Sequence, residues 1–223
     1  MASHVAASRS QSKPSKVPIP ITRVVVSVCA GRCETESQAK PTDLVVCFDV
    51  DKRAMLAGKF AYKYVWPRTK RNVIFHHHNM ATGLKEILAN FRASTGVEVV
   101  VLFQHPSPSG DRSSRGALAA AGRDCVSALL LGHASEMHFV FDCHSQKNTW
   151  TGAKLQKHCL SKCDVLARDS LAVSNPVSIC DESANTYNHP VFGTVDRRGW
   201  ALMRKGEEVT FKIVKKQVLL EEH

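Results

Sequence analysis

The sequence predicts an α/β fold organised around a doubly wound, mostly parallel β-sheet. Short apolar, β-branched runs alternate along the chain with segments of helical periodicity, and the runs are apolar at nearly every position. Continuous apolarity suits strands that are buried on both faces of a sheet. Strands that alternate with helices form right-handed βαβ units, so the sheet should be parallel with helices on both faces. The chain has 223 residues, of which 43% are hydrophobic, which is enough for one such domain.

Five apolar runs define the expected parallel strands, and the strongest signal is Val97–Phe103. Near the C-terminus, Trp200–Arg204 and Val209–Val214 flank a Lys-Gly-Glu-Glu turn and predict an antiparallel hairpin. Together these segments predict a Rossmann-like sheet that ends in a C-terminal antiparallel hairpin. The parallel strands are expected at residues 23–29, 44–48, 73–76, 97–103 and 137–142.

Helical signals lie between these runs. Asp51, Asn79 and Asp111 are placed to cap three helices, and Gly132 is placed to end the third. A fourth helix is indicated by an apolar stripe with a spacing of four. The apolar positions of the four helices are Met55, Leu56 and Phe60; Leu84, Ile87, Leu88 and Phe91; Leu118, Ala121, Cys125 and Leu129; and Leu155, Cys159 and Cys163.

Two regions differ in composition. Residues 1–20 are rich in Ser, Ala, Lys and Pro and contain no acidic residue, so a disordered basic tail is expected there, with a short mitochondrial presequence as the alternative. Residues 21–223 are expected to form the Rossmann-like domain. The eight cysteines occur without a secretory signal, which indicates reduced thiols inside the cell, in the nucleus or nucleolus or alternatively in the mitochondrion. No apolar run approaches the ~18 residues that span a bilayer, so no membrane partner is expected.

The positive charge predicts an anionic partner, and RNA is the first candidate. The formal net charge is +10, and the pI is near 9.3. Cations and aromatic rings interleave in Tyr62–Arg71, and further basic segments lie at 197–198 and 212–216. Cations neutralise phosphates and aromatic rings stack on bases. The candidate RNA-binding residues are Lys63, Trp66, Arg68, Lys70, Arg71, Arg197 and Arg198.

Candidate cofactor residues follow from the rule that ligands bind beyond the carboxyl ends of the strands. Cys29, Ala30 and Gly31 form a small-residue turn after the first strand. Asp49 ends the second strand, eighteen positions after Gly31 (49 − 31), near the ~20 expected for an acidic residue that binds ribose hydroxyls. A role as a cap or turn residue stays open for Asp49. Asn79, after the third strand, can read an adenine edge.

The loop after the fourth strand is the candidate for group-transfer chemistry. It begins with Gln104 and His105, and the following prolines stiffen it. His105 can act as a general base or orient a substrate base, while a purely structural loop is the alternative. The histidines at 76–78 and the Cys-x-x-x-Cys pairs at 29/33 and 159/163 are poorly spaced for chelation, so no metal is expected.

Several short segments, in the same order along the chain, resemble class I S-adenosylmethionine-dependent methyltransferases. Within that class they most resemble the 25S rRNA uridine-N3 methyltransferase family. Residues 79–84 (NMATGL) resemble its V-D-A-T-x-L segment, and residues 103–106 (FQHP) resemble its F-P-H loop. Residues 148–150, 187–189 and 197–199 resemble its S-W segment, its C-terminal tyrosine and its basic run. The resemblance covers roughly residues 22–215.

The resemblance implies S-adenosyl-L-methionine as cofactor and a ribosomal RNA base, of the uridine N3 type, as substrate. His105 and Gln104 would then serve catalysis, and Phe103 would join the cofactor residues. The family's V-G-E-G-D-F-S turn is here Val28–Glu34 (VCAGRCE), and Asn79 replaces its Asp. The tRNA guanine-N7 methyltransferases are a second possible relative.

Three functions stay open on sequence grounds. The first is an RNA methyltransferase, which is expected to be a monomer and to contact ribosomal proteins. The second is a catalytically degenerate member that serves as an RNA-binding or ribosome-assembly factor, because the glycine-rich turn has changed. The third is a methyltransferase for small molecules or proteins, which the positive charge disfavours.

Overall fold

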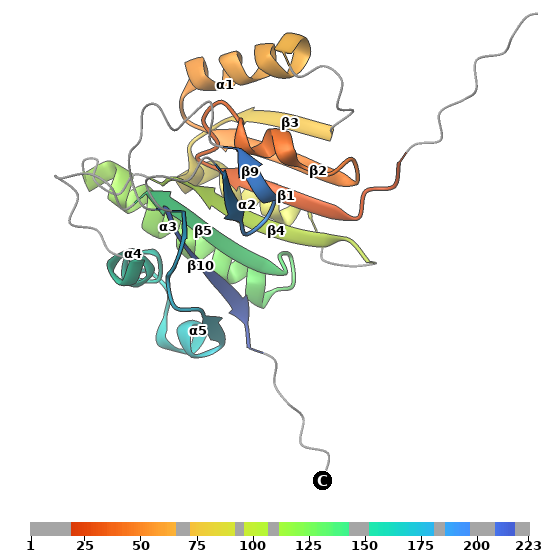
Figure 1. Ribbon diagram of the computed structural model, residues 1–223. Helices are drawn as coiled ribbons and strands as arrows, with labels where there is room; N and C mark the ends of the chain where they lie inside the picture. Colours follow the sequence, from red (N-terminus) through yellow and green to blue (C-terminus); the bar gives the residue numbers. More distant parts are fainter. Residues whose placement is uncertain are drawn as a thin grey trace, which may run out of the picture.

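The computed structural model describes residues 19–65, 72–91, 96–106, 112–142, 152–180, 186–196 and 208–216 (Figure 1). Its main sheet has the order β3-β2-β1-β4-β5-β10-β6, and β7 also pairs with β10. β1 to β5 are parallel and β10 is antiparallel to its neighbours. The Rossmann-like, mostly parallel sheet is therefore confirmed. The strands are β1 (Arg23–Val28), β2 (Asp43–Asp49), β3 (Asn72–His77), β4 (Glu98–Gln104), β5 (Glu136–Asp142), β6 (Leu171–Val173), β7 (Val177–Cys180) and β10 (Glu208–Lys215).

The C-terminal antiparallel strand is also confirmed, with partners that the sequence did not indicate. One edge of β10 pairs with β5, and its other edge pairs with β7 near Glu208 and with β6 near Val214. Residues 200–204, the expected first arm of the hairpin, lie outside the described residues, as do the N-terminal tail at 1–18 and the expected cap Asp111.

The helices begin where the polar caps predicted. The Asp51 carboxylate accepts hydrogen bonds from the backbone N–H groups of Arg53 and Ala54, and the Asn79 side chain accepts one from Ala81. These bonds satisfy donors that the first turn of a helix leaves without partners. The helices are α1 (Lys52–Phe60), the single π-turn η2 (Ala61–Val65), α2 (Met80–Ala89), α3 (Arg112–Leu130), α4 (Gly152–Cys159) and α5 (Val165–Asp169).

One face of the sheet, the apolar face, is covered by α2, α3 and α4. Phe103, Phe139 and Phe211, from β4, β5 and β10, stack in series with ring centroids 4.5 and 4.6 Å apart. α3 and α4 approach so closely that a Cβ on Gly122 would lie 2.3 Å from the carbonyl oxygen of Cys159. The largest hydrophobic cluster of the molecule forms here.

The opposite face, the polar face, has an unusual cover. The crossover between β1 and β2 contains only the short 3-10 helix η1 (Thr35–Gln38), where a Rossmann crossover carries an α-helix. The two-stranded hairpin β8 (Thr186–His189) and β9 (Gly193–Asp196) packs Val191 and Phe192 onto this side of the sheet (Figure 1). Arg23 fastens the hairpin, because it pairs with both carboxylate oxygens of Asp43 and donates to the Val191 carbonyl at 2.9 Å.

α1 lies on the same side as the hairpin, and its apolar residues are only partly buried. Met55 is buried against β2, but Leu56 and Phe60 are 55% and 61% exposed. Of the three apolar positions of this helix, Leu56 and Phe60 therefore lie on the outer side. The apolar residues of α1 spread over a wide part of the helix surface, but only the side of the helix that carries Met55 packs against the sheet.

Candidate functional site

The candidate site lies at the carboxyl edge of the sheet, where the chain leaves β1 and β4 in opposite directions. Val28 and Phe103 are paired in register at this switch point, where open α/β sheets bind ligands. Cys29, Cys33 and His105 are the non-glycine residues with positive φ in the described part of the chain, at 60°, 57° and 48°. Such backbone strain concentrates at functional sites, so its grouping beside the switch point supports a site here.

Asp49 and Gly31 form the centre of this edge. The Asp49 carboxylate accepts hydrogen bonds from the backbone N–H of Gly31 at 2.8 Å and of Asp51 at 2.7 Å. An ionised carboxylate offers about four acceptor positions, so it retains capacity for ligand hydroxyls. Gly31 has φ +55°, and a Cβ built on it would meet nothing within 4 Å. The turn is therefore open beside a partly buried carboxylate.

Cys29 links the turn to the start of α2. Its thiol lies 3.8 Å from the Met80 sulfur, next to the helix cap Asn79. Burial, with the nearby Asp49 carboxylate, raises the pKa of the Cys29 thiol to about 12. The thiol therefore stays protonated and is a poor nucleophile, because the thiolate is the reactive form. Cys29 and Asn79 border the open turn from the β1 and β3 sides.

A chain of hydrogen bonds runs beneath the β4 loop on the polar face. His189 Nδ1 accepts from the backbone N–H groups of Val191 and Phe192, so Nε2 carries the proton and donates to Gln104 Oε1 at 3.2 Å. Gln104 Nε2 in turn donates to Thr35 Oγ1 at 3.1 Å. Burial, together with the nearby His105, lowers the pKa of His189 to about 3, which keeps its ring neutral. The chain fixes the residue directly before His105.

Glu36 lies in the same layer and has no exposed surface. Ser27 Oγ donates to its Oε1 at 2.5 Å, while Oε2 has no hydrogen-bond partner among the described residues. Burial raises the pKa of the Glu36 carboxyl to about 7, against the lowering effect of the Ser27 hydrogen bond. The polar face thus holds a carboxyl group that is largely protonated below neutral pH.

Three of the predicted site residues are buried and contact other parts of the protein. Phe103 is fully buried and stacks on Phe139, because successive strand residues point to opposite faces and Phe103 points into the apolar core. Ala30 is 4% exposed, and its backbone N–H donates to the Phe48 carbonyl. Gln104 is also 4% exposed and bonds to protein at both ends of its amide. These side chains pack beneath the candidate site and do not line it.

The remaining predicted site residues fall into two groups, one at the carboxyl edge of the sheet and one away from it. Cys29, Gly31, Asp49, Asn79 and His105 all border the carboxyl edge of the sheet. The backbone N–H of His105 donates to the Val140 carbonyl at 2.7 Å, and its side chain is half-buried. Lys63 is exposed on η2. The other predicted RNA-binding residues, Trp66, Arg68, Lys70, Arg71, Arg197 and Arg198, lie outside the described residues.

Sequence reasoning missed Glu36 and His189. Both are polar residues in segments without apolar periodicity, so no pattern marks them as buried. The only local signal is Asn-His-Pro at 188–190, where a proline follows a histidine near the end of a short strand.

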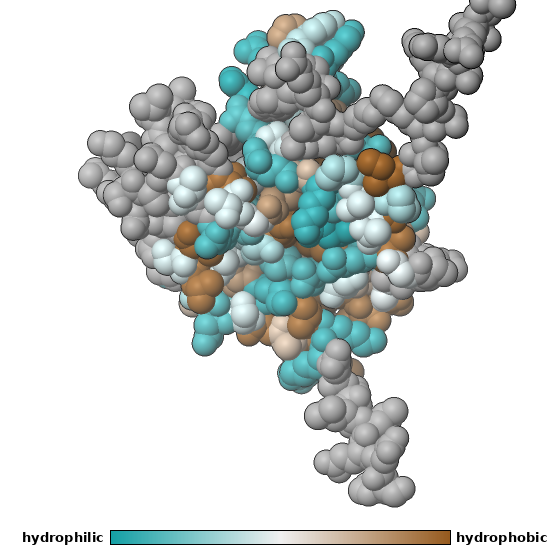
Figure 2. All heavy atoms as spheres, turned by 45° about the vertical axis from the view of Figure 1, so that its right-hand side comes forward, coloured by the Kyte–Doolittle hydropathy of each residue, from teal (hydrophilic) through white to brown (hydrophobic). Residues whose placement is uncertain are grey.

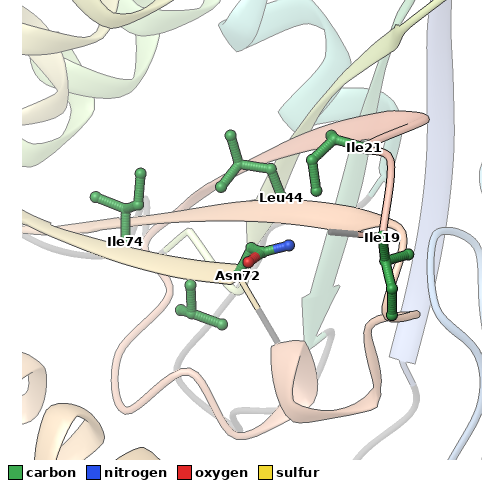
Figure 3. A pocket seen from close by; sticks show the side chains of 6 residues that line it. Ile19, Ile21, Leu44, Asn72 and Ile74 are labelled. Carbon is green, nitrogen blue, oxygen red and sulfur yellow. The ribbon is translucent and has the colours of Figure 1, made fainter. Parts of the chain in front are cut away.

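A shallow apolar hollow lies at the opposite edge of the sheet (Figure 3). It is formed at the amino ends of β2 and β3 and by the segment that leads into β1. Because ligand sites of open α/β sheets lie at the carboxyl edge, this hollow is not part of the candidate site. Its lining residues are Ile19, Ile21, Leu44, Asn72, Val73 and Ile74.

The described residues were also compared with the requirements of a metal site and of a membrane-spanning helix. The part of the chain that the structure describes contains no group of three or more His, Cys, Asp or Glu side chains arranged to hold a metal ion. Of the adjacent histidines, His77 Nε2 contacts the Val50 carbonyl oxygen, whereas the His78 ring stacks on Phe48. Within the described ranges, no helix has both the length and the apolarity to cross a membrane.

Comparison with solved structures identifies the fold. No family model and no curated protein matches the sequence. The 16S rRNA (adenine(1408)-N(1))-methyltransferase from Catenulisporales acidiphilia is 15% identical, with a TM-score of 0.54 over 88% of this chain and 89% of that chain. An rRNA methylase from Streptococcus thermophilus is 10% identical, with a TM-score of 0.52 over 90% of both chains. The N-methyltransferase NodS from Bradyrhizobium japonicum is 9% identical, with a TM-score of 0.50 over 89% and 88%. The chain has the Rossmann-like fold of class I methyltransferases.

Proposed function

We propose that this protein is an S-adenosylmethionine-dependent methyltransferase that acts on RNA. The observation that carries the proposal is the pairing of Asp49 with the open Gly31 turn at the switch point of a class I methyltransferase sheet. A carboxylate in this position accepts ribose hydroxyls, and a turn without a Cβ lets a ligand approach the backbone.

The residues present fit the adenosine half of S-adenosylmethionine. Asp49 would hold the ribose, the Asn79 amide would lie near the adenine edge, and Cys29 and Gly31 would supply the floor of the turn. Since η1 replaces a full helix after β1, the contacts depend on side chains and on the turn rather than on a helix N-terminus. When bound, S-adenosylmethionine supplies the electrophilic methyl group.

His105 is the residue to which we assign the step on the methyl acceptor. It follows β4 directly at the switch point, and its left-handed backbone conformation turns the chain away from the buried strand. N3 of a uridine must lose its proton before it accepts a methyl group, and we assign the acceptance of that proton to the His105 imidazole. Gln104 and His189 are positioning residues, because they hold the backbone that carries His105.

RNA is supported as the substrate class by two independent points. The net charge of +10 favours a polyanion, and two of the structures with this fold are described as methyltransferases of ribosomal RNA. A ribosomal RNA base of the uridine N3 type is the specific substrate that we propose. Nuclear or nucleolar localisation, with the mitochondrion as alternative, monomeric state and contact with ribosomal proteins belong to the same proposal.

A methyl-transfer assay tests this function. The purified chain is incubated with S-adenosylmethionine labelled in the methyl group and with unmodified ribosomal RNA, and the RNA is digested to locate the label. Replacement of His105 by Ala should lower kcat by about 100-fold or more, while S-adenosylhomocysteine affinity stays unchanged. Unchanged kcat would remove His105 from the reaction.

A second candidate function is favoured by the reduced crossover. The crossover holds η1 in place of a helix, and the turn holds a single glycine. In this alternative the chain keeps the fold without the reaction and serves as an RNA-binding or ribosome-assembly factor. This alternative predicts RNA binding without a thermal shift from S-adenosylhomocysteine. A true cofactor site would raise the free energy of unfolding by roughly 2.7 kcal/mol at 100 times Kd.

A further inference from the structure

We infer that the exposed surface of α1 and η2 is a stacking platform for unpaired bases of single-stranded RNA. The platform is defined by the aromatic residues Phe60 and Tyr64 and the cations Lys59 and Lys63. The inference rests on the proposed function only in taking RNA as the partner, and it is independent of methyl transfer.

The aromatic rings of this segment divide between two roles. Tyr62 faces inward, since its hydroxyl donates to the Cys33 carbonyl at 3.1 Å and its ring meets Phe75 edge-on. Phe60 and Tyr64, on either side of it, are 61% and 57% exposed. Tyr62 therefore fixes this segment to the protein. Phe60 and Tyr64 bury little surface, so packing of the core does not explain why aromatic residues stand at these two positions.

The two outward rings lie next to each other with cations beside them. Their centroids are 4.8 Å apart and the rings are tilted by 46°, so the ring faces do not close fully against each other. The Lys63 ammonium lies 4.9 Å from the Tyr64 centroid. Lys59 lies 6.0 Å from the Phe75 centroid, on the same ridge. Aromatic faces with cations beside them are the components of sites that stack bases and follow a phosphate backbone.

Charge selects RNA over a protein partner. Residues 52–71 contain seven Lys or Arg and no Asp or Glu. In Figure 2, hydrophilic residues predominate at the top of the molecule, where α1 lies in Figure 1. A surface for protein docking would instead join its apolar residues into a largely uncharged centre. α1 also begins three residues after Asp49, and Tyr62 contacts the carbonyl of Cys33, two residues after Gly31, so RNA held on the platform would lead toward the candidate site.

Base stacking, rather than charge alone, predicts a preference for single strands, because paired bases present no free faces. Phosphate attraction alone would favour a duplex at least as strongly. Substitutions of the aromatic residues and of the cationic residues should therefore have different effects on RNA binding. Loss of the rings should weaken single-strand binding without changing its salt dependence, and loss of the cations should reduce the salt dependence.

The experiment measures binding of the full chain to a fluorescent single-stranded RNA and to the duplex of the same sequence, over a range of salt concentrations. The double variant Phe60→Ala/Tyr64→Ala should bind the single strand about tenfold more weakly or worse, with an unchanged salt slope. The variant Lys59→Ala/Lys63→Ala should flatten the slope of log K against log salt by about 1.4, from about 0.7 per contact. Lys85→Ala on α2, across the sheet, and Leu131→Ala, which removes an exposed apolar residue after α3, are the matched controls.

The inference would be overturned if the wild type bound duplex and single strand equally well, if the aromatic variant bound RNA like the wild type, or if the control variants weakened binding as much as the platform variants do. Absence of RNA binding by the wild type would also overturn it. Calorimetry with S-adenosylhomocysteine on the same proteins keeps the two proposals apart. The platform variants should bind it normally, so a failed platform with intact cofactor binding leaves the proposed methyltransferase standing.

Discussion

The two faces of the sheet are built differently. On the apolar face, three stacked phenylalanines and the helices α2, α3 and α4 form a core in which nearly every inward side chain is hydrophobic. On the polar face, η1 and the β8–β9 hairpin cover a layer that includes Ser27, Glu36, Gln104 and His189, all at most 4% exposed. The first face resembles the interior of any α/β domain, whereas the second places hydrogen bonds where a helix would ordinarily place apolar side chains.

The difference shows how stability and positioning are divided. Apolar packing is non-directional and tolerates small shifts, so it stabilises the sheet without fixing a particular loop. Hydrogen bonds are directional, and a buried polar chain loses much of its stabilisation when one member moves. The polar layer ends at Gln104, directly before His105, and therefore couples the hairpin to the candidate site.

The largest expected effect is on the apolar face. Phe139→Ala would remove the middle ring of the stack and leave a cavity between β4 and β10. Such a substitution should lower the free energy of unfolding by about 3–5 kcal/mol, measured by urea denaturation. Below the melting temperature of the variant, S-adenosylhomocysteine affinity should match that of the wild type. Weaker binding by a folded variant would show that the two faces are not separable.

A second prediction uses the buried carboxyl group of the polar face. The pKa of Glu36 is about 7 in the folded protein against 4.5 ordinarily, so the unfolded chain releases this proton first. The protonated form stabilises the fold fully below pH 4.5, and this contribution is lost as pH rises to about 7. The Glu36→Gln variant does not ionise at this position, so its stability does not decrease in this way as pH rises.

The stability of Glu36→Gln relative to wild type should therefore rise with pH through this window, by on the order of 3 kcal/mol. His189, whose pKa is lowered to about 3, acts in the opposite direction, because the unfolded chain takes up its proton as pH falls below 6.5. That contribution is common to both proteins and cancels in the difference. Urea unfolding at several pH values measures the difference in the free energy of unfolding between Glu36→Gln and the wild type. If this difference did not change with pH, Glu36 would ionise normally.

A third prediction tests the coupling to the site. Gln104→Leu would leave Thr35 and His189 without this partner, so it should cost about 1–3 kcal/mol of stability and lower kcat with little change in cofactor affinity. Thr210→Val is the control. Thr210 is buried on the same face and donates to the Phe139 carbonyl, but it is not part of the hydrogen-bond chain of Thr35, Gln104 and His189. If both variants lower kcat alike, the effect reflects stability and not positioning.

The sequence predicts the apolar face much better than the polar face. The five parallel strands and the caps Asp51 and Asn79 appear within a residue or two of their expected places, because periodicity and capping are local signals. The polar layer joins residues from 27 to 189 through side-chain hydrogen bonds, which leave no periodic trace. The resemblance implies a cofactor role for Phe103, but a short motif does not show to which face of the sheet a strand residue points, and the pleat turns Phe103 into the apolar core.

The exposure of α1 has a similar cause. Apolar spacing identifies which residues share a helix face, but the width of the contact with the sheet decides how many of them are buried. Met55 alone of its stripe is buried, and the outward positions of Leu56 and Phe60 depend on how α1 lies against β2 and β3.

The central claim is that the carboxyl edge around Asp49 binds the cofactor, and calorimetric titration with S-adenosylhomocysteine tests it most directly. The wild type should bind at one site, and Asp49→Ala should weaken binding at least tenfold, about 1.4 kcal/mol. Asp51→Ala, which removes only the cap of α1, should lower stability by about 1 kcal/mol and leave the affinity unchanged. Equal affinity of the wild type and Asp49→Ala, or no binding by the wild type, would contradict the account.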